Sequence, residues 1–204
     1  MKFFKWKDFL ITSIVCLSPI VLGILLWDKL PETMAIHFDI KGNPDNFAKK
    51  GFVVLGLPVL MALAQAVLCF ATDFNSKKRG GSKKFETVAK WIIPIMTSIL
   101  QLATLGIGLG ILVDIRVVAG AIVGVVLIVL GNYMPKLDYV KNYKIEPEKA
   151  KKINRFMGVE SVIMGFLFLI SLFLPPIATV VCIILLIPYT LIGVIYGLYV
   201  TRKK

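Results

Sequence analysis

Long apolar runs alternate with short polar segments along the whole chain. An α-helix rises 1.5 Å per residue, so about 20 apolar residues cross the roughly 30 Å hydrocarbon layer of a bilayer. The pattern therefore predicts an all-α fold: a polytopic bundle of six transmembrane helices forming one integral membrane domain over residues 1–204. The six runs are Phe9–Trp27, Phe52–Thr72, Trp91–Val113, Val117–Met134, Gly158–Leu174 and Ile177–Val200.

The positions of proline and glycine indicate where these helices kink, begin or pack closely. Pro19 is expected to kink the first run, which ends in Trp27-Asp28-Lys29 without a small-residue cleavage site and is therefore predicted to be retained. The segment Glu146-Pro147-Glu148-Lys149 is typical of the start of a short surface helix. Three G-x-x-x-G spacings suit close helix packing in lipid: Gly106/Gly110, Gly120/Gly124 and Gly193/Gly197.

The basic residues are distributed unevenly between the runs. Of the 24 Lys and Arg residues, 19 lie in the two termini and in the segments 73–90 and 135–157, and the other five lie in the alternate segments. Because cytoplasmic loops are enriched in Lys and Arg, both termini and these two basic loops are predicted to be cytosolic, and the 28–51 loop extracellular. The net charge of +12 then reflects topology and contact with anionic membrane lipid, and no nucleic-acid partner is expected.

The 28–51 loop carries the residues best suited to ligand binding, metal binding or catalysis. It holds the only histidine, His37, together with Asp39 and Asp45. The turn-forming Gly42-Asn43-Pro44-Asp45 folds the loop back and brings His37 towards Asp45, with Gly42 free to take positive φ. Alternation of Phe38 and Ile40 with polar neighbours predicts a short extended piece with one face on the bundle. Three interpretations stay open: a structural cap or ligand surface, a metal site, and a catalytic site.

Few polar residues fall within the apolar runs. Glu160 lies near the inner end of the fifth run, where it either snorkels to headgroups or pairs with Asn132 or Lys136. Gln101 is expected to bond another helix. The three cysteines lie in apolar runs, no catalytic signature occurs, and no motif implies a cofactor, so the chain is not predicted to be an enzyme.

Two blocks resemble the SdpI-type immunity family of bacterial membrane proteins. The first is Pro31…His37-Phe38…Gly42…Pro44-Asp45…Lys50, and the second is Gly131-Asn132-Tyr133-Met134-Pro135-Lys136. The resemblance implies a multi-pass protein of the bacterial cell membrane that protects against a secreted peptide toxin, with a cytosolic repressor as a second partner. One block of the family is missing, because Lys144-Ile145 runs straight to Glu146-Pro147, and this weakens the expectation of a cytosolic relay.

The predicted function is thus immunity to a peptide toxin that is bound or blocked at the outer face. The predicted ligand-binding residues are His37, Phe38, Asp39, Gly42, Pro44, Asp45 and Lys50, and the predicted intramembrane polar residues are Asn132, Lys136 and Glu160. The alternative is a small transporter or a metal-dependent membrane enzyme that uses the His and Asp residues of the outer loop.

Overall fold

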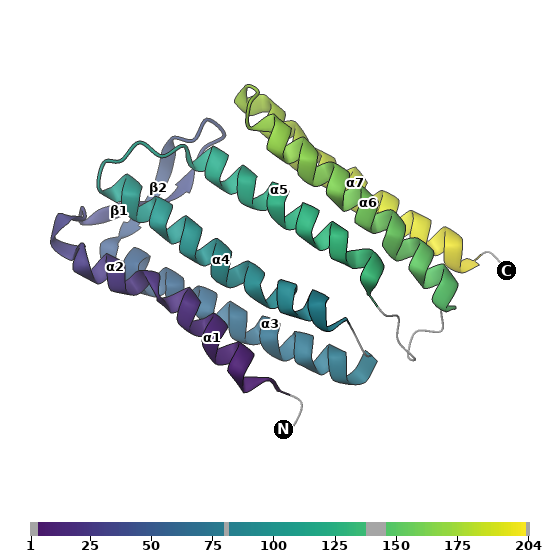
Figure 1. The fold of residues 1–204 in the computed structure, drawn as a ribbon. Coiled ribbons are helices and arrows are strands. Elements are labelled where there is room, and N and C mark those ends of the chain that lie inside the picture. The colour runs from purple at the N-terminus through teal and green to yellow at the C-terminus, as the bar shows by residue number, and fades with distance from the viewer. Residues whose placement is uncertain (1–3, 80–81, 138–145, 203–204) are drawn as a thin grey trace. The chain divides into compact units, whose positions relative to one another are not determined.

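The computed structural model describes residues 4–79, 82–137 and 146–202. Six helical spans in this part of the chain are long and apolar enough to cross a membrane, which confirms the predicted six-helix class. The helices are α1 (Trp6–Leu17), α2 (Pro19–Leu25), α3 (Leu57–Arg79), α4 (Lys83–Gly108), α5 (Ile115–Tyr133), α6 (Pro147–Ser171) and α7 (Pro176–Arg202) (Figure 1). Short helical turns lie at η1 (Trp27–Lys29), η2 (Phe52–Gly56) and η3 (Met134–Lys136).

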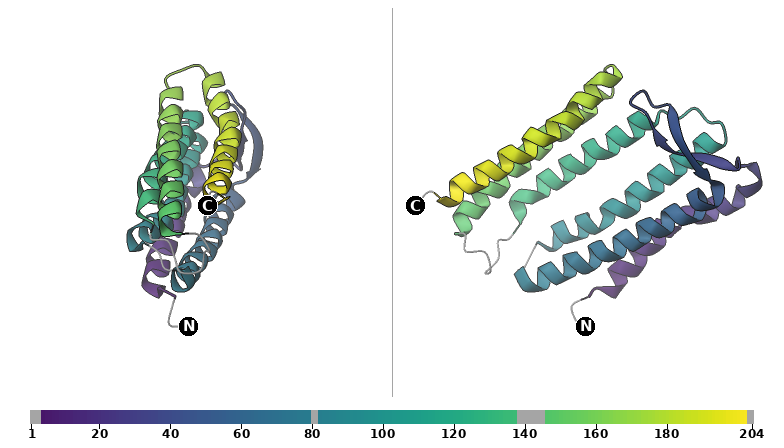
Figure 2. Two further views of the ribbon diagram at one scale, coloured as in Figure 1. Left: turned by 90° about the vertical axis from the view of Figure 1, so that its right-hand side faces the viewer. Right: turned by 180° about the vertical axis from the view of Figure 1, so that it is seen from behind.

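The chain divides into two compact units. One comprises Met1–Asp73 with Lys90–Ala119, and the other comprises Phe74–Ala89 with Gly120–Lys204. The first holds α1, α2, most of α3 and α4, and a β-hairpin. The second holds most of α5 and the α6–α7 pair, whose helices run side by side in all views (Figure 2).

The first span is interrupted where the sequence predicts a kink. Helix α1 ends at Leu17 and α2 begins at Pro19, whose ring nitrogen cannot donate a hydrogen bond. The carbonyl of Val15 accepts from the Ser18 hydroxyl at 2.9 Å and from the Ser98 hydroxyl of α4 at 3.4 Å. Hydroxyl side chains thus donate to the Val15 carbonyl, which has no backbone N–H donor from Pro19, and a helix in lipid needs such bonds for its polar backbone groups.

Glutamine side chains serve the same purpose at two further prolines. Pro58 cannot donate to the Val53 carbonyl of the π-helical turn η2, and Gln101 Nε2 donates to that carbonyl at 2.8 Å. Pro94 similarly leaves the Lys90 carbonyl free, and Gln65 Nε2 donates to it at 2.8 Å. The expected bond from Gln101 to another helix is confirmed.

Glycines bring α5 and α6 together within the second unit. A β-carbon added at Gly131 would lie 2.6 Å from the Gly158 oxygen, and one added at Gly165 would lie 2.6 Å from the Gly124 oxygen. The packing role predicted for Gly124 is confirmed. That predicted for Gly110 is wrong, because Gly110 follows the end of α4 with φ +81° and has no atom near its missing side chain.

Both basic loops contain more helix than predicted. Helix α3 continues to Arg79 and α4 starts at Lys83, so the 73–90 segment is mostly helical. Helix α6 starts at Pro147 and runs into the fifth span without a break, so the predicted short surface helix is the first part of a transmembrane helix. Amphipathic and basic turns lengthen these helices beyond the apolar runs that hydropathy detects.

Candidate functional site: the β-hairpin between the first two spans

The segment between the first two spans folds into a two-stranded antiparallel hairpin. Strand β1 spans Thr33–Phe38 and β2 spans Pro44–Lys49 (Figure 1). The sequence predicted one extended piece in this loop, and the structure adds a second strand that pairs with it. PDNFAK combines residues that β-strands disfavour, so its conformation depends on pairing with β1 rather than on its own propensity.

Apolar side chains anchor the hairpin to the first unit. Met34 is 2% exposed and Leu30 is 4% exposed, and both join a core with Val53, Val54 and Leu105. Ile40 was expected on the bundle face but is 62% exposed, and Phe38 is half-buried. The anchoring residue of β1 is therefore Met34, which the alternation around Phe38 did not identify.

The base of the hairpin is closed by Lys50. Its N–H donates to the Glu32 carbonyl at 2.9 Å, and its ammonium lies 2.9 Å from Glu32 Oε1. The same ammonium lies 5.1 Å from the centre of the Trp27 ring and 3.4 Å from the Trp27 carbonyl. Lys50 thus stabilises the base of the loop, and a direct ligand role for it stays a prediction.

The tip of the hairpin is organised by Asp39. Its Oδ1 accepts from the N–H groups of Lys41 and Asn43, each at 2.8 Å, and its Oδ2 accepts from Asn43 Nδ2 at 3.1 Å. The Asn43 backbone N–H, then the Asn43 side chain, and more weakly the N–H of Lys41 lower the pKa of the exposed Asp39 carboxyl below its ordinary value. Gly42 adopts φ +88°, which confirms its predicted positive φ. The turn thus starts at Asp39, before the predicted Gly42–Asp45.

His37 and Asp45 join the two strands on the exposed side of the hairpin. His37 Nδ1 lies 2.5 Å from Asp45 Oδ1. The register of the two strands is irregular on both sides of His37, towards Ala35 and towards Phe38. The side chains are 68% and 46% exposed. The expected approach of His37 to Asp45 is confirmed, and the pair presents an imidazole and a carboxylate to the surroundings of the protein.

The metal interpretation finds little support in this geometry. Across residues 4–79, 82–137 and 146–202, no group of three or more His, Cys, Asp or Glu side chains is placed to hold a metal ion. Asp39, the third candidate ligand, directs both carboxylate oxygens to the turn rather than to His37.

The predicted pairing of Glu160 is not formed. Within the described residues, Glu160 Oε2 is buried without a hydrogen-bond partner, Asn132 is exposed, and the Lys136 ammonium lies 4.8 Å from the Tyr133 ring. Because α6 begins at Pro147, Glu160 lies near the middle of the helix, about 17 Å from its end at Ser171. Its predicted location near the inner interface stays a prediction, because the basic residues Lys151, Lys152 and Arg155 precede Glu160 on α6.

A buried ionic cluster in the first unit was missed. The Lys90 ammonium lies 2.6 Å from Asp73 Oδ1 and 3.4 Å from Asp8 Oδ2, and the Lys5 N–H donates to Asp73 Oδ2 at 2.9 Å. These contacts join the start of α1 to α3 and α4. The spacing Gln65, Cys69, Asp73 marks one polar face of α3 and is the sequence signal for this cluster.

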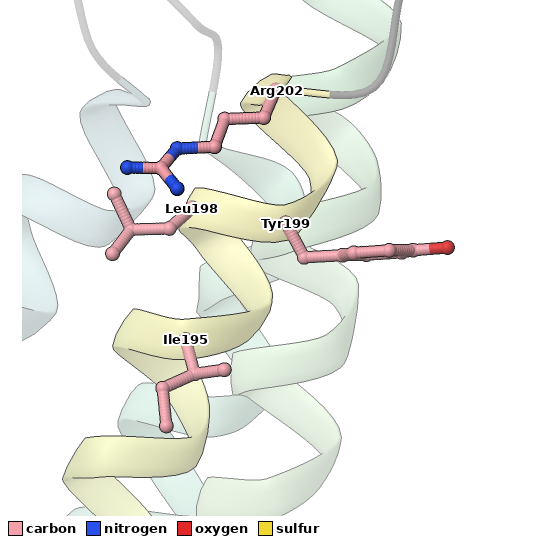
Figure 3. Close-up of a pocket in the computed structure, with 4 residues that line it drawn as sticks. All are labelled: Ile195, Leu198, Tyr199 and Arg202. Atoms are coloured by element: carbon pink, nitrogen blue, oxygen red, sulfur yellow. The ribbon is translucent and has the colours of Figure 1, made fainter.

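A shallow groove lies along the last two turns of α7. It is lined by Ile195, Leu198, Tyr199 and Arg202, and Figure 3 shows Leu198 and Arg202 on one side of the helix and Tyr199 on another. Three apolar or aromatic side chains and one cation from a single helix suit the surface of a membrane helix better than a catalytic site.

These features define a polytopic helical membrane protein with a hairpin at one end of its first helical unit. The family model described as a domain of unknown function, DUF1648, matches residues 14–62, which include the whole hairpin. The chain is 30% identical over 177 residues to the immunity protein SdpI of Bacillus subtilis (strain 168), an alignment that covers 82% of each chain. The chain belongs to the SdpI family of immunity proteins and is a multi-pass protein of a bacterial membrane. No solved structure gives a significant match.

Proposed function

We propose that this chain protects a bacterial cell from a secreted peptide toxin, which it binds or blocks through the hairpin at the extracellular face of the cell membrane. The observation that carries the proposal is the 30% identity to an immunity protein over 82% of both chains. The DUF1648 match over residues 14–62 includes β1 and β2, so the hairpin lies in the region that this chain shares with that family.

The geometry of the hairpin supports a binding role. The exposed groups of the hairpin are held in one arrangement by the contact of His37 with Asp45 across the strands and by the turn at Asp39. Met34 anchors the hairpin to the helices. A pre-organised surface loses less conformational entropy when a ligand binds. Phe38, Gly42 and Pro44 contribute to the proposed surface through the turn and the Phe38–Pro44 strand pair.

The proposed orientation places both termini in the cytosol. It is supported by the 19 Lys and Arg residues on one set of segments against five on the other. Anionic lipid at the inner face then contacts the basic turns. A relay to a cytosolic repressor is the weaker part of the proposal, because the family block is absent after Asn142-Tyr143, and Asn142–Ile145 lie outside the described residues.

The direct test is protection of a sensitive cell. The chain is expressed in a bacterium killed by concentrated culture supernatant of Bacillus subtilis strain 168, with an unrelated multi-pass protein at the same membrane level as the control. We expect survival at supernatant concentrations that kill the control cells. Identical killing curves for the two strains would refute protection against this toxin source.

A further inference from the structure

The register of the hairpin determines which main-chain groups face outward. In an antiparallel ladder, hydrogen-bonded residue pairs alternate with pairs whose N–H and C=O groups point away from the partner strand. The bond from the Lys50 N–H to the Glu32 carbonyl makes these two residues a bonded pair. By alternation, Lys49 and Phe47 belong to non-bonded pairs, so their N–H and C=O groups point to the outer edge of β2.

A separate contact agrees with this assignment. The Phe47 N–H donates to its own neighbour, Asn46 Oδ1, at 2.8 Å, instead of to β1. Five of the six residues of β2 are exposed, whereas Met34 and Ala35 of β1 are buried. In the described part of the chain, the outward main-chain groups of β2 are therefore satisfied only by local groups and by solvent. These donors and acceptors are available to a further strand.

The side chains along this edge indicate what kind of partner fits. Phe47 is 54% exposed and supplies an apolar contact. Lys41 and Lys49 are exposed and form no ion pair with the described residues. Each carboxylate of the hairpin already has a hydrogen-bond or ion-pair partner, whereas the ammonium groups of Lys41 and Lys49 have no ion-pair partner among the described residues. The engaged carboxylates are Glu32 with Lys50, Asp45 with His37, and Asp39 with the turn.

We propose that β2 receives an extended peptide segment as a third strand, with an apolar side chain against Phe47 and an acidic side chain against Lys49. Strand addition takes its affinity from main-chain hydrogen bonds and its specificity from alternate side chains, and both are available here. The inference rests on the proposed function, because the peptide that it places on β2 is the toxin.

A pair of proline substitutions tests whether a peptide pairs with the outer edge of β2. Lys49→Pro removes an outward N–H of β2 without removing a β1–β2 hydrogen bond, and Thr33→Pro does the same on β1, since Thr33 is the register partner of Lys49. Survival of expressing cells is measured against concentrated Bacillus subtilis strain 168 supernatant at matched membrane levels. We expect Lys49→Pro to lower the tolerated concentration at least about tenfold, because it removes one main-chain hydrogen bond and the Lys49 ammonium from the contact with the peptide, and Thr33→Pro to leave it unchanged.

Shielding of single cysteines gives a second measurement that does not depend on a proline variant folding. Lys49→Cys and Thr33→Cys are labelled in intact cells with a membrane-impermeant thiol reagent, with the killing supernatant or with one from a non-killing strain. The three native cysteines are buried, which keeps the background low. We expect the killing supernatant to slow labelling at position 49 and leave position 33 unaffected.

The outcomes separate the two claims. If the unsubstituted chain gives no protection, the proposed function fails and the strand addition fails with it. If the unsubstituted chain protects, but Lys49→Pro protects equally well and position 49 is not shielded, strand addition alone is overturned.

Discussion

The ammonium of Lys90 lies 2.6 Å from Asp73 Oδ1, with the two side chains 2% and 0% exposed. Removing one partner of a buried pair leaves an uncompensated charge, so Lys90→Met is expected to destabilise the protein by about 3 kcal/mol. The double variant Lys90→Met/Asp73→Leu should be less destabilised than Lys90→Met, because neither charge remains buried. Thermal unfolding in detergent measures both, and equal stability of Lys90→Met and the unsubstituted protein would argue that the pair contributes nothing.

Close backbone packing of α5 and α6 leads to a second prediction. Gly158→Ala places a methyl group 2.6 Å from the Gly131 carbonyl oxygen, and backbone cannot move aside as a flexible side chain can. We expect a loss of about 1–3 kcal/mol in stability, the usual range for overpacking. Gly197→Ala is the matched control, since no atom lies within 4 Å of its added β-carbon. Equal melting temperatures for the two variants would contradict the packing.

The turn at Asp39 should be sensitive to acid. Hydrogen bonds from Asn43 and Lys41 lower the pKa of the folded Asp39 carboxyl, so its contribution to turn stability is present above the ordinary aspartate pKa, about 3.9, and is lost as the pH falls through the lower folded value. A spin label at Lys41→Cys should be ordered at neutral pH and become mobile only below about pH 4. Asp39→Asn should remove this pH dependence. A label whose mobility is the same at all pH values would show that Asp39 does not control the turn.

Topology is tested by accessibility. Single cysteines replace Asn43 in the hairpin turn and Ser82 between α3 and α4, and intact cells are treated with a membrane-impermeant thiol reagent. The charge asymmetry predicts labelling at position 43 and protection at position 82 until the cells are opened. The reverse labelling would require an inverted orientation.

The sequence was sufficient for the six spans because hydrophobic runs of membrane length have few alternative explanations. It also indicated the approach of His37 to Asp45 and the positive φ of Gly42, because turn chemistry is local. It did not reveal β2, whose strand conformation depends on pairing with β1. It also did not reveal the burial of Asp73 and Lys90, because a hydropathy scale treats a charged residue as exposed wherever its partner lies.

The missing partner of Glu160 has a related cause. Asn132 and Lys136 were expected to pair with it because they lie at a similar position along the next span, whereas Asn132 is exposed and the Lys136 ammonium lies beside the Tyr133 ring. The side chains that meet between two helices are decided by how the helices pack, which an apolar run does not specify.

The most direct test of the proposed role of the hairpin is whether the His37–Asp45 pair is required for protection. His37→Ala and Asp45→Ala are compared with Asp28→Ala, which removes an exposed carboxylate outside the hairpin strands, in the survival assay at matched membrane levels. We expect both hairpin variants to lose protection at undiminished membrane level, while Asp28→Ala protects like the unsubstituted chain. Full protection by His37→Ala and Asp45→Ala, or a loss that only follows a fall in protein level, would contradict the hairpin as the site of action.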